Sequence, residues 1–81
     1  MHQVQIDDLL RIRNPLNIDK YVFAKVKYID LLSDPYTYGV IIRDTDGWNL
    51  KIMMITPYYI IKNFNNISFH KLKEDYPEFI I

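Results

Sequence analysis

Apolar and polar residues alternate along most of the chain, and this alternation predicts β-strands. In residues 3–13 one side of the alternation is apolar, and its members are Val4, Ile6, Leu10 and Ile12. A period of two is that of a strand with one buried face. The pattern slips at Asp7 and Asp8, where we expect a bend, a bulge or a short helical turn.

Further strands are expected at residues 21–32 and 38–43, and turn residues separate them. Asn14 and Pro15 begin a loop before the first of these strands, because proline lacks the amide donor that a central strand needs. Residues 33–36 then form a turn, with a proline setting φ at a central position.

The clearest local signal is Asp44-Thr45-Asp46-Gly47, a compact polar segment between two alternating runs. Glycine accepts the positive φ that tight hairpins require, so this segment predicts a β-hairpin. Its second arm covers residues 48–54. On one side of that arm we expect Trp48, Leu50, Ile52 and Met54.

After the hairpin, Thr56 and Pro57 look like an N-cap followed by proline at the first helical position. One or two turns of helix over residues 57–63 are therefore expected. Residues 67–70 then predict a final short strand. Residues 71–81 mix charge with an apolar ending, and we expect them to pack as a C-terminal extension on a single domain spanning residues 1–81.

Five strands with short connections and one helical turn before the last strand resemble the general plan of small SH3-like or Tudor-like barrels. The resemblance implies a small, mainly β, five-stranded antiparallel barrel. The peptide-binding SH3 family places a tyrosine three residues after the proline of that turn and a tryptophan near the start of the third strand. Here Ile60 stands three residues after Pro57 and Trp48 directly follows the hairpin turn, so that family's ligand site is not transferred.

With 81 residues, the chain is long enough for one hydrophobic core. It has no cysteine, which excludes disulfides and thiolate metal sites. Its apolar runs are far shorter than a membrane span of roughly 20 residues, and its start does not resemble a signal peptide. We expect a cytoplasmic protein without membrane contact.

The residue pattern contains no motif that is typical of a catalytic, metal-binding or phosphate-binding site. His2 and His70 have no partner at metal-ligand spacing. The adjacent carboxylates Asp7 and Asp8 point to opposite faces of a strand. Glycine is too scarce for a phosphate-binding loop. The sequence therefore predicts a protein that is not an enzyme and has no metal, no cofactor and no catalytic residue.

Basic residues fall on the polar side of the predicted strands or the hairpin arm, whereas most acids fall in turns or near the C-terminus. The basic set is Arg11, Arg13, Lys25, Lys27, Arg43 and Lys51. Such a face suits nucleic-acid phosphates or an acidic protein. It is equally typical of long side chains that cover exposed strands, and the formal net charge of zero favours this second interpretation.

Aromatic residues are frequent, with seven tyrosines, four phenylalanines and one tryptophan. Two tyrosine pairs flank predicted turns and are candidates for an exposed partner-binding cluster. They are Tyr36, Tyr38, Tyr58 and Tyr59.

These observations favour a non-catalytic binding module that engages a protein partner. A composition typical of AT-rich coding sequence suggests, more specifically, a phage or mobile-element protein that binds and inhibits a host factor. The first alternative is a nucleic-acid-binding β-barrel that uses the basic set with stacking tyrosines. The second is a structural homo-oligomer in which residues 79–81 or an open strand edge pairs with another copy.

Overall fold

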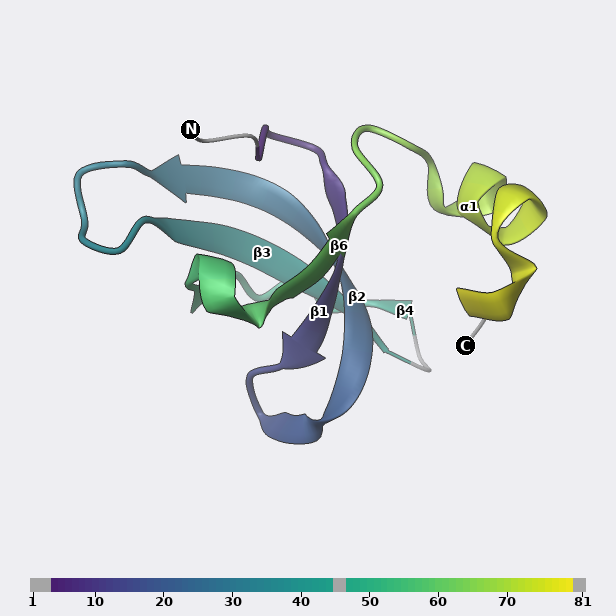
Figure 1. Cartoon of the computed structure of the whole chain (residues 1–81), viewed down its shortest axis with the longest axis horizontal. Helices are drawn as coiled ribbons and strands as arrows, with labels where there is room; N and C mark the ends of the chain where they lie inside the picture. Colours follow the sequence, from purple (N-terminus) through teal and green to yellow (C-terminus); the bar gives the residue numbers. More distant parts are fainter. Residues whose placement is uncertain (1–3, 45–46, 80–81) are drawn as a thin grey trace.

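The computed structural model describes residues 4–44 and 47–79 as an antiparallel β-sheet with one short α-helix (Figure 1). The strands are β1 (Leu9–Asn14), β2 (Asn17–Asp30), β3 (Thr37–Asp44), β4 (Gly47–Trp48), β5 (Met53–Ile55) and β6 (Ile60–Asn63). The helical elements are the 3-10 helix η1 (Pro57–Tyr59), the α-helix α1 (Phe69–Asp75) and the 3-10 helix η2 (Pro77–Phe79). The prediction of a mainly β, antiparallel fold is confirmed.

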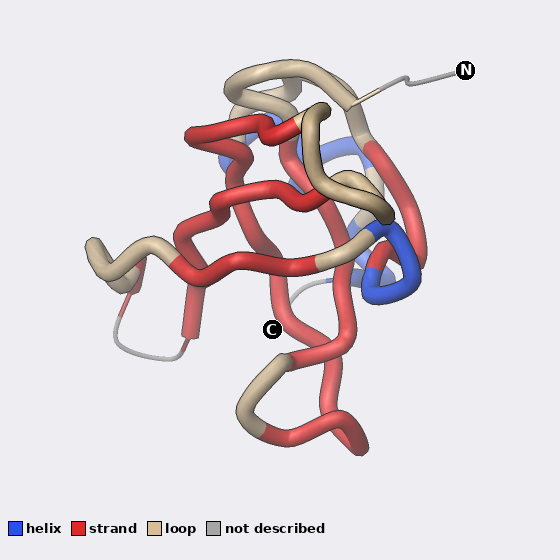
Figure 2. The backbone as a smooth tube through the Cα atoms, turned by 90° about the vertical axis from the view of Figure 1, so that its left-hand side faces the viewer, coloured by secondary structure: helices blue, strands red, loops and turns tan. Residues whose placement is uncertain are grey.

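Hydrogen bonding orders the six-stranded sheet as β4-β3-β2-β1-β6, and β5 pairs with β3. Within the described residues the end strands β4 and β6 do not pair with each other, so the sheet does not close into the predicted barrel. Figure 2 shows the strands changing direction across the sheet, as expected of strongly twisted strands.

One face of the sheet carries the main core. The inward side chains of β1, β2 and β3 follow the alternation seen in the sequence, and β5 adds Ile55. The buried members are Val4, Leu10, Ile12, Ala24, Val26, Tyr38, Val40, Ile42 and Ile55. Burial of these apolar side chains is the main favourable term for folding.

The opposite face of the sheet is also buried at its centre, under α1 (Figure 1). Its buried members are Leu9, Phe23, Phe64 and Leu72, and we call them, with the half-buried Trp48, Ile67, Phe69 and Tyr76, the aromatic cluster. The Phe69 ring meets the Phe23 ring edge-to-face at a centroid distance of 5.4 Å, a favoured aromatic geometry. Helix α1 is therefore a second apolar layer on the sheet.

Helix α1 begins where the sequence predicted a final strand at residues 67–70, so that prediction is wrong. Ser68 is the N-cap, and its hydroxyl accepts a hydrogen bond from the Lys71 backbone N–H at 3.1 Å. One helical turn further on, Glu74 Oε1 lies 3.1 Å from His70 Nε2. The N-cap and the spacing of His70 and Glu74 thus favour a helix over the strand that the alternation of residues 67–70 predicted.

The predicted helix at residues 57–63 is only partly present. Pro57 starts the 3-10 helix η1 as expected, but η1 ends at Tyr59 and β6 follows immediately. Ile60 and Ile61 are β-branched, which favours strand over helix. Strand β6 pairs with β1, so the last strand of the sheet comes directly after the 3-10 turn.

The bend predicted near Asp7 is confirmed, because Asp7 has φ of 71°. Strand β1 starts after it, at Leu9, rather than at residue 3. Residues 1–3 lie outside the described residues.

In the hairpin, residues 45–46 also lie outside the described residues, while Asp44 pairs with Gly47 as predicted. The second arm is not one continuous strand, because β4 ends at Trp48 and β5 begins at Met53. Trp48 pairs with Arg43 and Met54 pairs with Gly39, so both side chains lie on the same face of the sheet, as predicted for this side of the arm. Ile55 pairs with Tyr38 on the opposite face, where it is buried in the main core.

Leu72→Ala is expected to destabilise the protein by about 2 to 5 kcal/mol, because the side chain is replaced by a cavity in the aromatic cluster. Leu72 is 2% exposed. Leu32, which is 98% exposed, provides the matched control, and Leu32→Ala should change stability by less than about 0.5 kcal/mol. Urea unfolding followed by tryptophan fluorescence measures both. Equal, small effects would contradict the packing of α1 on the sheet.

Candidate functional site

A row of cationic and aromatic side chains crosses the sheet on the face that carries α1. Each member is paired in register with the next across neighbouring strands, and directly paired residues share one face. In strand order the row is Lys62, Arg11, Phe23, Arg43 and Trp48. Helix α1 adds Phe69 and Lys73 to this surface. These seven residues are called the cation–aromatic face.

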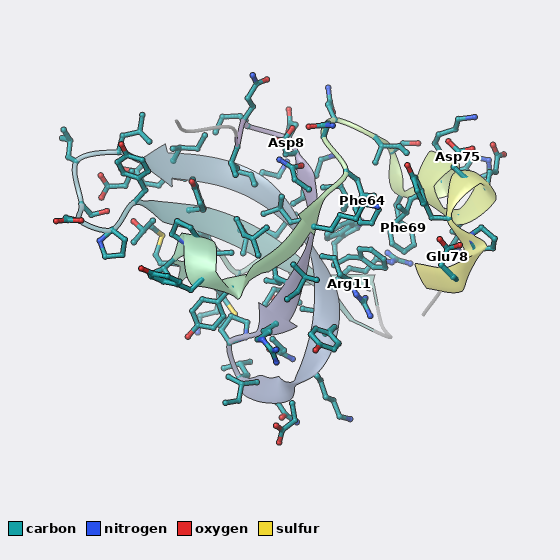
Figure 3. The ribbon with its side chains drawn as sticks, viewed as in Figure 1. Asp8, Arg11, Phe64, Phe69, Asp75 and Glu78 are labelled. Atoms are coloured by element: carbon teal, nitrogen blue, oxygen red, sulfur yellow. The ribbon has the colours of Figure 1, made fainter. Side chains whose placement is uncertain are left out.

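The cations of this face lie over aromatic rings. The Arg43 guanidinium carbon is 4.3 Å from the Phe69 ring centroid, and that of Arg11 is 4.6 Å from the Phe23 centroid. The Lys73 amine lies 5.4 Å from the Phe69 centroid. These distances are within the range of cation–π attraction. Figure 3 shows Arg11, Phe64 and Phe69 gathered between the strands and α1.

Arg11 occupies an unusual environment for a permanent charge. It is half-buried, and its Nη1 atom is buried without a hydrogen-bond partner. Burial lowers the pKa of Arg11 from its ordinary value, and the nearby Tyr21 opposes this shift. An arginine nevertheless remains protonated in proteins, so the positive charge is held here at a desolvation cost.

Three cations of this face differ from the lysine at the start of α1 in their ion pairing. Among the described residues, Arg11, Arg43 and Lys73 form no ion pair with a carboxylate. The carboxylates of α1 pair instead with Lys71. Its Nζ atom lies 3.8 Å from Glu74 Oε2 and 3.4 Å from Asp75 Oδ1. The arrangement therefore leaves positive charge available to an anionic ligand.

A second candidate site is an open pocket of about 370 Å³. It lies between the β1–β2 hairpin and η1, and its lining is Arg13, Ile18, Tyr58 and Tyr59. Arg13 Nη1 donates a hydrogen bond to the Ile18 carbonyl at 3.2 Å. Its guanidinium carbon lies 5.3 Å from the Tyr21 centroid. Two contacts thus hold the single cation among the residues that line the pocket.

The four tyrosines proposed from the sequence do not share one site. Tyr58 and Tyr59 line the pocket, whereas Tyr36 and Tyr38 do not. Tyr38 is 3% exposed and belongs to the main core, opposite Ile55. Burial raises the pKa of Tyr38, and the neighbouring Tyr36 adds to this shift. Tyr36 is partly exposed near the β2–β3 connection.

The six basic residues proposed from the sequence also do not share one surface. Arg11 and Arg43 lie on the cation–aromatic face, and Arg13 lies at the pocket. Lys25 is half-buried on β2, opposite Leu9. The remaining two, Lys27 and Lys51, are exposed; Lys27 Nζ lies 3.5 Å from Asp7 Oδ1, and Lys51 follows β4 in the connection to β5.

Sequence reasoning missed Lys62, Lys73 and Ile18. The first two lie in β6 and α1, whose secondary structure was predicted wrongly or incompletely. Ser68 three residues before Lys71, followed by strong helix formers, is the signal that could have placed Lys73 on a helix. Ile18 lies at the start of β2, in the segment predicted as a loop.

Asp8 is the buried carboxylate of the described structure, and its contacts are structural. Its Oδ2 accepts hydrogen bonds from the Gln5 backbone N–H at 2.9 Å and from Asn63 Nδ2 at 3.0 Å. The bonds tie the turn before β1 to the end of β6. Within the described residues, no group of three or more His, Cys, Asp or Glu side chains could hold a metal ion.

Around Gly39 the sheet also exposes an apolar patch. A Cβ atom at Gly39 would lie 2.9 Å from both Ile52 Cγ2 and Tyr28 Cβ, and 3.3 Å from Met54 Sδ. Ile52, Tyr28 and Met54 are each about half exposed. Only glycine allows these three side chains to approach one another over β3.

Comparison of the chain with models of protein families, with curated proteins and with solved structures gives no match. No helix in the described part of the chain has the length and apolar character needed to cross a membrane.

Asp8→Ala and Asn63→Ala should be strongly coupled, because each removes one partner of a buried hydrogen bond to a carboxylate. A double-mutant cycle is expected to give a coupling energy of roughly 1 to 2 kcal/mol. Urea unfolding of the wild type, both single variants and the double variant measures it. Additive effects, within about 0.3 kcal/mol, would show that the two side chains do not interact.

Proposed function

We propose that this protein is a non-catalytic binding module whose pocket, lined by Arg13, Ile18, Tyr58 and Tyr59, receives a short segment of a partner protein. The observation that carries the proposal is the composition of the pocket. Two phenol rings and one aliphatic side chain line it, together with a single guanidinium. Mostly apolar concave sites with a few fixed polar groups are typical of ligand-binding sites.

Two of the pocket residues, Tyr59 and Arg13, are held in place before a ligand arrives. Tyr59 packs against the main core, and Arg13 is fixed by the Ile18 carbonyl and the Tyr21 ring. Tyr58 is 84% exposed and offers a large apolar surface with a polar hydroxyl. Preorganised side chains lose little conformational entropy on binding. The chemistry fits a peptide segment in which an apolar side chain lies next to a carboxylate.

An SH3-like arrangement is part of this proposal. Strands β5 and β6 flank the η1 turn, β6 pairs with β1, and β5 pairs with β3. The helical turn directly before the last strand is the feature that supports this part of the proposal. The proposal describes an open version of that plan, with the short strand β4 and helix α1 added.

A more specific form of the proposal is a phage or mobile-element protein that inhibits a host factor. The support is compositional, since isoleucine, lysine, asparagine and tyrosine are frequent in the chain. In that form, the pocket would bind and block one bacterial protein.

Self-association is a second candidate function, which the exposed apolar patch around Gly39 supports. Residues 80–81, which were also proposed to pair with another copy, lie outside the described residues. Sedimentation of the purified protein tests this candidate. A monomeric mass at high concentration would exclude it.

Affinity capture from a nuclease-treated bacterial lysate tests the peptide pocket. The tagged wild type is expected to retain one dominant protein, and Tyr58→Ala should reduce its recovery about tenfold, as for an interface hot spot. Tyr28→Ala is the matched control, because Tyr28 is an exposed tyrosine away from the pocket.

Recovery that is equal in the wild type and both variants would contradict the pocket as the binding site. Arg13→Gln distinguishes the guanidinium from the rings. It should weaken capture and reduce its salt dependence, because only the charged contact is screened by salt.

A further inference from the structure

The cation–aromatic face brings several cations together on one side of the sheet. Arg11, Arg43 and Lys73 lie together without a carboxylate partner among the described residues. Arg11 is also partly desolvated. The exposed amine of Lys62 extends the charge over Phe64, at 5.3 Å from its centroid. Such a concentration of cations favours a ligand with several negative charges.

Lys62, Arg11 and Arg43 follow one another across the sheet, and the buried Phe23 lies between the two arginines. Neighbouring strands are about 4.8 Å apart, so these cations span roughly 14 Å from β6 to β3. Rings hold the two guanidinium groups in place, since Arg11 stacks on Phe23 and Arg43 on Phe69. A line of fixed cations suits a chain of phosphates better than a single compact anion.

Aromatic groups flank this line. Tyr21 is 45% exposed, and its ring centroid lies 5.8 Å from the Arg11 guanidinium carbon. Trp48 is half-buried, and its ring centroid lies 5.7 Å from the Arg43 guanidinium carbon. Tyrosine, tryptophan and guanidinium planes stack on nucleobases. Bases are accessible to such stacking in single strands and not inside a duplex.

We propose that the cation–aromatic face binds single-stranded nucleic acid, with the cations on backbone phosphates and Tyr21 and Trp48 against bases. This activity goes beyond the peptide-binding function proposed for the pocket. An acidic peptide could also satisfy the charges, and poly-glutamate is therefore the competing ligand in the test below. Asp75 and Glu78 lie on the helical segment beyond the face (Figure 3) and give it an acidic rim.

Fluorescence anisotropy with oligo-dT and oligo-U of about 12 nucleotides tests the proposal. Binding to the wild type should weaken with salt, with a log–log slope of about −3 if four phosphates are neutralised. The double variant Arg43→Gln/Lys73→Gln should bind about tenfold more weakly and lower the magnitude of the slope by about 1.4.

Two controls are matched to that variant. Lys71→Gln removes a lysine from the same helix, but one paired with Glu74 and Asp75, and should change affinity by less than about twofold. Arg43→Lys keeps the charge and should retain most of the affinity. Circular dichroism and thermal melting establish that each variant is folded.

Three results would overturn the proposal. They are no binding at about 50 mM salt, equal loss of affinity in Lys71→Gln and the double variant, or binding of poly-glutamate as tight as that of the oligonucleotides. Tyr58→Ala separates the two sites, because it should leave oligonucleotide binding unchanged whether or not the peptide pocket exists. Tight binding of a duplex with no binding of single strands would also contradict the assigned stacking.

Discussion

The central strands of the sheet carry apolar residues on both faces. Leu9 and Leu10 are adjacent and both buried, and the same is true of Phe23 and Ala24. Because adjacent residues in a strand point to opposite faces, one apolar layer cannot cover all four side chains. The main core covers Leu10 and Ala24, so a second layer must cover Phe23. Helix α1 provides it, with Leu72 and Phe69 packed against the sheet.

The second layer is incomplete, and arginine side chains complete it. Helix α1 is short, and it places Phe69 over Phe23. On one side of this contact the Arg11 guanidinium lies on Phe23, and on the other the Arg43 guanidinium lies on Phe69. Long cationic side chains can cover apolar surface while their charged ends reach solvent. The same residues that protect the rings from water therefore concentrate charge on one face, so the stability of the fold and the proposed binding share one origin.

Local alternation was sufficient to predict the strands that line the main core, because each has one consistently apolar face. It was insufficient where contacts between distant segments decide the structure. The apolar run at residues 67–70 is compatible with either strand or helix, and packing on the sheet favours the helix. The residues of the candidate site also fall into two groups, those that the sequence could place and those that it could not. Arg11 and Arg43 could be placed on one face because their strands were predicted correctly. Lys62 and Lys73 could not, since the sequence around them leaves the type of element open.

The formal net charge of zero is a poor guide to what this protein binds, because its charges are segregated. The molecule is 36 Å long, whereas electrostatic screening at physiological ionic strength acts over about 8 Å. Asp30 and Asp34 belong to the region where β2 leads into β3, and Figure 1 shows that loop at the opposite end from α1. Glu74 and Asp75 lie in α1 itself, but they pair with Lys71. A ligand at the cation–aromatic face would therefore be exposed to the local cations rather than to the sum of all charges, so a formal net charge of zero does not exclude the proposed binding.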